Sequence, residues 1–223
     1  MTYFSVMLAV FRKDLTAERR SREVLSSMLV FALLAVILLV FAFELSANLQ
    51  KEAFSGTIWV SLCFAGTLGL TRSFSLEREN NSLAGLLMSP VDRSAIYFGK
   101  MLANWVFILI LTVILVPVAG FFFGINPFHW ALFGIILLGT LGYSLCGTFL
   151  ATITSRLHNR ELYLPILLFP VIVPLLLAAI RATSVVLNGG AAGELTTWLL
   201  MLLGFDLLFM AVGLLLFETI VAD

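Results

Sequence analysis

The chain has 223 residues, of which 61% are apolar and only 12% are charged, whereas a soluble globular domain carries about 25% charged residues. A soluble domain of this length leaves roughly a third of its surface exposed, and there are too few polar residues here to cover it, so the composition excludes an ordinary soluble domain and favours an integral membrane protein. The chain has 13 Lys and Arg residues and 13 Asp and Glu residues. It therefore lacks the net positive charge that would indicate nucleic acid as a partner.

Residues 3–22 are predicted to form an amphipathic helix that lies in the membrane interface. Tyr3, Met7, Phe11 and Leu15 recur at every fourth position, and the basic residues of this segment fall largely elsewhere on the helix. Such a helix places its apolar face in the membrane and its basic face toward anionic lipid headgroups. A simple extension of the first membrane span is the alternative that this pattern leaves open.

Six apolar runs follow that are long enough to cross about 30 Å of hydrocarbon as helices. They cover roughly residues 24–43, 54–70, 101–123, 128–154, 162–180 and 196–217. The first run has no small-residue cleavage signal after it, so we interpret it as a retained membrane helix. We therefore predict an all-α integral membrane protein with six transmembrane helices, built as one domain over residues 1–223.

Basic residues alternate between the intervals that separate the spans. The segment before the first span and the intervals after the second, fourth and sixth hold 11 Lys and Arg residues, and the other three intervals hold two. The positive-inside rule then places both termini in the cytoplasm. We expect a multi-pass protein of a cytoplasmic (inner) membrane.

The longest polar interval, residues 71–100, has room for structure of its own on the cytoplasmic side. Four leucines gather on or beside one helical face, and they are Leu76, Leu83, Leu86 and Leu87. This helix is expected to stop near Ser89, because Pro90 disfavours helical geometry in the residue before it. The pattern predicts a cytoplasmic elbow between spans two and three: a short amphipathic helix over residues 77–89, a turn, and a fresh membrane helix.

Two later spans carry residues that shape helix packing. The fifth carries three prolines, each of which removes a backbone hydrogen bond and can bend the helix: Pro165, Pro170 and Pro174. We interpret this span as a kinked helix that serves either packing or a moving cavity wall. The fourth carries three glycines that predict close approach of neighbouring helices: Gly139, Gly142 and Gly147.

One acid, Asp206, is predicted to lie deep in the bilayer. It is ten residues into the last predicted span, hence about 15 Å below the surface at 1.5 Å per residue. Intramembrane carboxylates are costly enough to suggest function, and no basic residue lies at matching depth. Alternatively, the span begins later, or Asp206 forms a hydrogen bond with Ser or Thr on a neighbouring helix.

Motifs of catalysis and metal binding are missing. The Gly-Lys pair at 99–100 lacks the upstream glycine of a phosphate-binding loop, and neither G-x-S-x-G nor H-E-x-x-H occurs. His129 and His158 lie at opposite membrane faces in the predicted topology, so they cannot share one metal. Cys63 and Cys146 lie in separate spans and are expected to be packing residues. We predict no enzyme, and no metal or cofactor bound by this chain alone.

The elbow resembles the cytoplasmic loop of ABC-2 type permeases. The matching residues are Glu77-Arg78-Glu79, Ser82-Leu83, Leu86-Leu87, Ser89-Pro90 and Gly99-Lys100. Asn81 and Ala84 stand where that motif usually has Gly and Glu. Within the class, residues 89–94 and 142–183 are similar to the haem exporter protein B family, the permease of cytochrome c maturation. The resemblance covers essentially the whole chain.

This resemblance implies a homodimeric permease subunit of an ABC transporter, docked on a cytoplasmic ATPase subunit that hydrolyses ATP on a separate chain. The expected contacts with the ATPase are Glu77, Arg78, Glu79, Leu83, Leu86, Leu87 and Pro90. It also implies a haem-handling membrane protein and a periplasmic haem chaperone as partners, with haem as cargo of the complex. ATP hydrolysis would drive release of the haem-loaded chaperone in c-type cytochrome biogenesis, whether or not haem crosses this chain.

Three alternatives stay open at this point. The chain could be an ABC-2 permease that exports another lipid, a polysaccharide or a drug. It could be a proton-coupled secondary transporter that uses Asp206, although such folds usually show internal repeats and the two halves of this sequence do not resemble each other. It could also be an assembly scaffold that transports nothing.

Overall fold

The structure is a computed structural model that describes residues 3–42, 50–79, 93–155, 157 and 160–222. Over these residues the secondary structure is helical throughout, apart from short turns. The helices are α1 Tyr3–Ser21, α2 Glu23–Ala42, α3 Gln50–Glu79, α5 Arg93–Phe123, α6 Trp130–Thr154, α7 Arg160–Asn188 and α8 Ala192–Ala222. Six of them, α2 to α8, are long and apolar enough to cross a membrane. The predicted all-helical architecture with six spans is confirmed.

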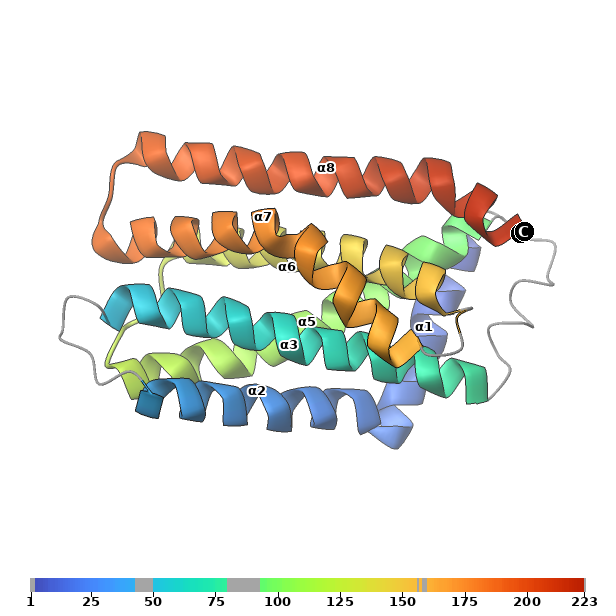
Figure 1. The fold of residues 1–223 in the computed structure, drawn as a ribbon, viewed down its shortest axis with the longest axis horizontal. Helices are drawn as coiled ribbons and strands as arrows, with labels where there is room; N and C mark the ends of the chain where they lie inside the picture. The colour runs from blue at the N-terminus through green and yellow to red at the C-terminus, as the bar shows by residue number, and fades with distance from the viewer. Residues whose placement is uncertain (1–2, 43–49, 80–92, 156, 158–159, 223) are drawn as a thin grey trace.

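The six long helices lie side by side, and successive helices run in opposite directions, while α1 crosses the bundle at one end (Figure 1). The last turn of α3, the first turns of α5 and α7 and the end of α8 lie at the same end as α1. The junctions α2–α3, α5–α6 and α7–α8 lie at the opposite end. The basic-rich and basic-poor intervals of the sequence are therefore separated at opposite ends of the bundle.

Several helices extend beyond the apolar runs that predicted them. Helix α3 continues to Glu79, nine residues past the predicted end of the second span, and α5 begins at Arg93, not near Met101. Helix α7 continues past Arg181 to Asn188. Hydropathy marks only the part of a helix that lipid contacts, whereas the backbone hydrogen bonds continue into polar sequence.

Helix α1 packs against the first turns of α5. Val6 and Val10 of α1 are buried together with Ala95 and Ile96 of α5. A Cβ atom at Gly99 of α5 would lie only 2.7 Å from the Met7 carbonyl oxygen and 2.8 Å from Val10 Cβ. Only a residue without a side chain allows this approach. One face of α1 therefore packs on protein.

The predicted membrane face of α1 also packs on protein, because its four residues are half-buried against the bundle: Tyr3, Met7, Phe11 and Leu15. The apolar side chains of α1 that face outward are those of Phe4 and Leu8. Phe4 is 74% exposed and Leu8 is 43% exposed. At the junction with α2, Arg22 has a left-handed backbone conformation with φ of 56°, which breaks the helix, and α1 then crosses the bundle axis (Figure 1). The alternative in which residues 3–22 simply extend the first span is wrong.

A buried acid fixes the corner between α1 and α2. The Glu18 side chain is 5% exposed, and its carboxylate accepts hydrogen bonds from the backbone N–H groups of Val24 at 3.2 Å and Leu25 at 2.8 Å. The first turn of a helix has N–H groups without partners inside the helix. Glu18 satisfies two of them for α2 and so acts as a cap from another helix.

Replacing Glu18 by Ala is expected to destabilise the protein by about 1–2 kcal/mol, the usual effect of losing a helix cap. The measurement is denaturant unfolding of the purified protein in detergent. Glu194→Ala is the matched control, because Glu194 is an exposed acid in the first turn of α8 and its loss should change stability little. Equal stability of the Glu18 and Glu194 variants would contradict the capping role.

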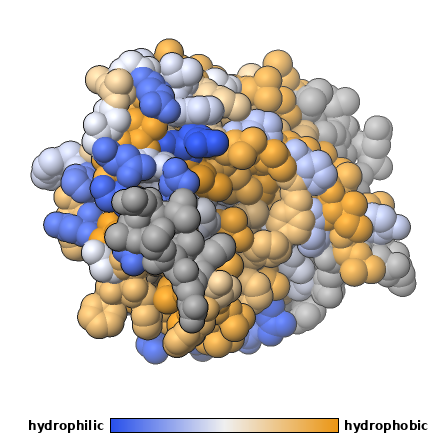
Figure 2. All heavy atoms as spheres, turned by 60° about the vertical axis from the view of Figure 1, so that its left-hand side comes forward, coloured by the Kyte–Doolittle hydropathy of each residue, from blue (hydrophilic) through white to orange (hydrophobic). Residues whose placement is uncertain are grey.

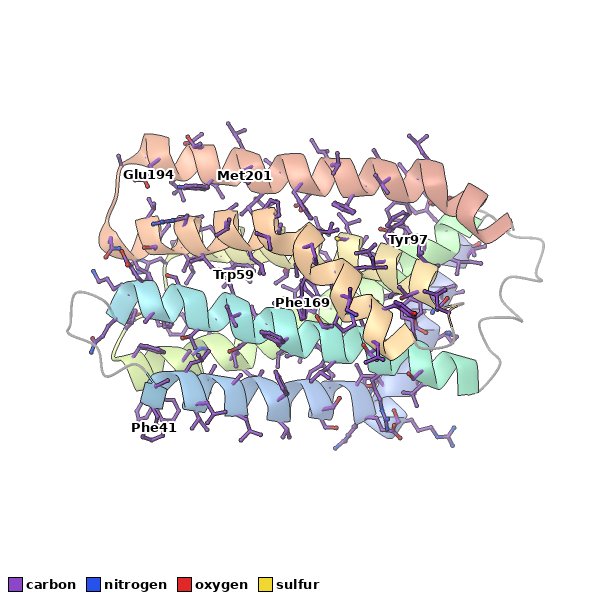
Figure 3. The ribbon with its side chains drawn as sticks, in the orientation of Figure 1. Phe41, Trp59, Tyr97, Phe169, Glu194 and Met201 are labelled. Atoms are coloured by element: carbon purple, nitrogen blue, oxygen red, sulfur yellow. The ribbon has the colours of Figure 1, made fainter. Side chains whose placement is uncertain are left out.

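Buried hydrogen bonds join four of the long helices. Between α3 and α7, the Trp59 indole N–H donates to the Thr183 hydroxyl at 2.9 Å; Figure 3 shows Trp59 inside the bundle. Between α3 and α6, the Tyr143 hydroxyl lies 2.9 Å from that of Thr67. Between α5 and α6, the Asn104 amide donates to Thr148 at 3.1 Å. Side-chain hydrogen bonds between membrane helices add roughly 0.6–2 kcal/mol each, so α3, α5, α6 and α7 form a cross-linked group.

The outward faces of the helices form an apolar belt. Large exposed hydrophobic residues occur on every long helix, among them Leu38 and Phe41 of α2, Val113 of α5, Ile166 of α7 and Leu207 of α8. Phe41 points away from the bundle in Figure 3. Figure 2 shows hydrophilic residues gathered at the end that has turned toward the viewer, with a broad apolar surface beside them. This is the surface of a protein whose solvent is lipid.

Candidate functional site

The predicted ATPase contacts fall partly outside the described residues. Glu77, Arg78 and Glu79 are the last three residues of α3, and the structure describes their backbone but not their side chains. The remaining predicted contacts, Leu83, Leu86, Leu87 and Pro90, lie in residues 80–92, outside the described part of the chain. Residues 77–79 continue the membrane helix, so the separate helix predicted to begin at residue 77 does not start there.

Helix α3 reaches well beyond the membrane on this side. Its 30 residues span about 45 Å at 1.5 Å per residue, against about 30 Å of hydrocarbon. The polar residues are concentrated in its last turns, so most of the excess lies at the end near α1. A force applied at residues 77–79 would therefore act on a rigid extension of the second span.

The base of this extension is held by contacts to two other helices, α5 and α2. Phe74 of α3 is 4% exposed, and the buried Lys100 ammonium of α5 lies 4.8 Å from the centroid of its ring, which is the geometry of a cation–π contact. Arg72 of α3 forms an exposed ion pair of 2.9 Å with Glu23 of α2. With α1 packed at Gly99, four helices meet at this end.

The second candidate site is the Asp206 carboxylate on α8. The residue is 3% exposed, and its two oxygens have no hydrogen-bond partner among the described residues. A Cβ atom at Gly142 of α6 would collide with Asp206 Oδ1 and would lie 2.8 Å from Leu175 Cδ1 of α7. The carboxylate therefore lies where α6, α7 and α8 meet.

One structural alternative for Asp206, a hydrogen bond with Ser or Thr, does not occur among the described residues, and the helix that carries the acid begins well before it. Helix α8 begins at Ala192, 14 residues before Asp206, which places the acid about 21 Å along the helix and not near its start. No Ser or Thr hydroxyl of the described residues bonds to it. An unpaired carboxylate in this position is costly, which favours a functional reason for it.

The glycines of the fourth span pack as predicted. A Cβ atom at Gly139 would collide with the Trp59 ring, and one at Gly147 would lie 2.5 Å from Leu70 Cδ1. Both neighbours belong to α3, and Gly142 allows the approach of α8. The prediction of close helix approach is confirmed.

All three prolines of the fifth span lie inside α7, whose axis changes direction part-way along (Figure 1). Pro170 and Pro174 are exposed on the outer surface of the bundle, and Pro165 is half-buried. They therefore do not line a cavity enclosed by this one chain. The interpretation of this span as a moving cavity wall would therefore require a cavity formed together with another chain. The interpretation as a packing feature has no such requirement.

Comparison with known proteins identifies the family. The family model described as CcmB protein matches residues 5–220, a range that begins in α1 and ends in α8. The chain belongs to the CcmB protein family. The predicted resemblance to haem exporter protein B is thus confirmed.

Individual CcmB relatives align over most of their length. The chain is similar to heme exporter protein B of Rhodobacter capsulatus, with 31% identity over 172 residues that cover 77% of this chain and 79% of the relative. The protein of the same name from Pseudomonas aeruginosa is 29% identical over 198 residues, 88% of this chain and 87% of the relative. That of Paracoccus denitrificans is 29% identical over 188 residues, 84% of each chain.

Several residues of this CcmB family chain escaped the sequence interpretation. The sequence patterns do not single out Glu18, and they match Gly99 and Lys100 to a motif without a structural role for either. Their partners lie in other helices, so periodicity along the chain gives no signal for them. The Gly99-Lys100 pair after the elbow is the signal in the sequence that could have pointed to a role for these two residues.

Proposed function

We propose that this chain is the membrane-spanning subunit of a haem exporter, driven by an ATPase on a separate chain and acting in c-type cytochrome biogenesis. The observation that carries the proposal is the family match over residues 5–220, together with six spans. The aligned relatives carry the name heme exporter protein B. We place the complex in the cytoplasmic membrane of a bacterium.

In this proposal the ATPase binds at the end of the bundle that carries α1 and the last turns of α3. Glu77 to Pro90 contact the ATPase, and α3 transmits the movement into the bundle, because it is one continuous helix from Gln50 to Glu79. The hydrogen bonds that join α3 to α6 and α7 would carry that movement to other helices. Asp206, at the meeting of α6, α7 and α8, is proposed to act in the same cycle.

Haem recognition is proposed to come from partners and not from a domain of this chain. At the end opposite α1, the intervals between helices are short: residues 43–49, 124–129 and 189–191. None has room for an external binding domain. A haem-handling membrane protein, a periplasmic haem chaperone and a second copy of this chain would complete the complex, and the apolar outer surfaces of α2, α7 and α8 offer area for membrane partners.

The proposed orientation predicts the results of topology reporters. Fusions after Asp223 and within residues 73–92 are expected to be cytoplasmic, and fusions near Gln50 or Gly189 external, because 11 of the 13 basic residues belong to one set of intervals. Paired phosphatase and fluorescent-protein fusions measure this. An external result for residues 73–92 would contradict the proposed topology, and it would also mean that a cytoplasmic ATPase cannot reach the end of α3.

The function is tested by chaperone release from isolated membranes that contain the complex. ATP is expected to release the haem-loaded chaperone from membranes that contain the chain, and a non-hydrolysable ATP analogue is expected not to. Membranes prepared with every other component but without this chain are the control. Equal ATP-dependent release in that control would contradict the proposed function.

A further inference from the structure

A groove of about 560 Å³ opens at the surface between α1, α2 and α5. Its deep part is apolar, with Leu25 and Leu29 of α2 on one side and Val106, Ile110 and Ile114 of α5 on the other. Ile110 and Ile114 are 42% and 41% exposed, so the groove opens sideways into the region that hydrocarbon occupies. Nothing in the proposed transport function uses this space.

The mouth of the groove is basic. Arg19 of α1 and Arg22 at the corner before α2 line it, and both are exposed. No acidic side chain among the described residues forms an ion pair with either arginine. Glu18 is the acid of the lining, and its carboxylate is already bound to the N–H groups of Val24 and Leu25.

The order of these groups along the groove matches one class of ligand. The two arginines lie at the level of the interfacial helix, and Leu29 lies seven residues further along, about 10 Å deeper. A ligand that fits has a negative charge at the interface and hydrocarbon below it. Guanidinium groups bind phosphate oxygens by paired, charge-assisted hydrogen bonds.

We propose that this groove is a binding site for one anionic glycerophospholipid of the leaflet on the α1 side. An acyl chain lies between α2 and α5, and the headgroup phosphate binds Arg19 and Arg22. The bound lipid lies between α1 and α2, beside the junction of these two helices that Glu18 caps. A helix of a partner protein fits less well. It would need an acidic side chain that contacts Arg19 and Arg22, and an apolar face that continues from that side chain into the deep part of the groove.

The test uses the full chain in nanodiscs with traces of a phosphatidylglycerol or a phosphatidylcholine whose acyl chain carries a photoreactive diazirine. Labelled peptides are mapped by mass spectrometry. We expect labelling of residues 25–29 and 106–114 at least about fivefold stronger with phosphatidylglycerol than with phosphatidylcholine, since one basic residue near a membrane surface changes anionic-lipid affinity by about this factor.

Two variants and one matched control separate this site from general attraction to the membrane. In Arg19→Gln/Arg22→Gly, labelling by phosphatidylglycerol should fall to the phosphatidylcholine level; glycine accepts the left-handed backbone at position 22 without strain. Ile110→Trp should block labelling by filling the groove while every charge remains. Arg12→Gln/Arg20→Gln removes two arginines of the same helix that do not line the groove, and labelling should persist.

Three outcomes would overturn the proposal. Equal labelling by the two lipids would show that the headgroup is not recognised. Equal loss in the Arg12/Arg20 control would show diffuse surface attraction instead of a site. Capture of a polypeptide by a photoreactive amino acid at position 110 in native membranes would show that a partner protein occupies the groove.

Discussion

Replacing Leu87 by Asp is expected to abolish recovery of the ATPase with this chain, and with it c-type cytochrome maturation, while the amount of the chain in the membrane stays at the wild-type level. In the proposed complex Leu87 belongs to the apolar face that residues 77–89 insert into the ATPase. Burying an unpaired carboxylate in such a groove costs several kcal/mol, and each 1.4 kcal/mol weakens binding about tenfold. Loss of affinity by at least about a hundredfold follows. Affinity purification with immunoblotting for the ATPase measures it.

The matched control is Leu157→Asp. Leu157 is an exposed leucine in the interval between α6 and α7, at the same end of the bundle but outside the elbow, so ATPase recovery should persist. Glu79→Lys reverses a charge at the end of α3 and is expected to weaken the same contact. If Leu87→Asp and Glu79→Lys both keep a normally coupled ATPase, residues 77–90 rest on the membrane interface and are not the coupling site.

Replacing Asp206 by Asn is expected to lower cytochrome c maturation several-fold without lowering the amount of protein in the membrane. The amide has the shape of the carboxyl group but cannot ionise, and removing a charge at this depth eases insertion, where an acid costs about 2.5–3.5 kcal/mol. Haem staining of c-type cytochromes and immunoblotting of membranes measure the two quantities. Unchanged maturation in Asp206→Asn would assign the residue a structural role only.

Glycine variants extend this test to the surroundings of Asp206. Gly142→Ala places a methyl group where Asp206 Oδ1 lies, so it should reproduce the maturation defect with the acid intact. Gly134→Ala on the same helix and Gly204→Ala on α8 are matched controls, because a Cβ atom at either position meets no atom within 4 Å. A similar defect in all three variants would mean that maturation responds to helix propensity and not to the packing of Asp206.

Hydropathy and basic-residue counts were enough to predict the architecture. The apolar runs identify all six spans, because a helix that crosses lipid must be apolar for about 20 residues. They miss the ends of α3 and α5, since nothing in hydropathy marks where a helix stops once it has entered water. The elbow was predicted from the spacing of leucines from Leu76 to Leu87, yet residues 77–79 belong to α3.

The candidate site was predictable only in part. Asp206 was found because a single charge in an apolar run is conspicuous, but its packing on Gly142 depends on the register between α6 and α8, which the sequence does not encode locally. Gly99 faces α1 across more than 80 residues of sequence, and Glu18 caps a helix other than its own. Such contacts follow from tertiary packing and not from periodicity.

The most direct measurement of the central proposal is gentle isolation of the tagged chain from its native membrane, followed by identification of the proteins that accompany it. We expect a small ATPase, a haem-handling membrane protein and a second, untagged copy of this chain, with the haem chaperone retained when ATP is withheld. Recovery of the chain without any ATPase, or with an ATPase and enzymes of lipid or polysaccharide synthesis in place of haem proteins, would contradict it.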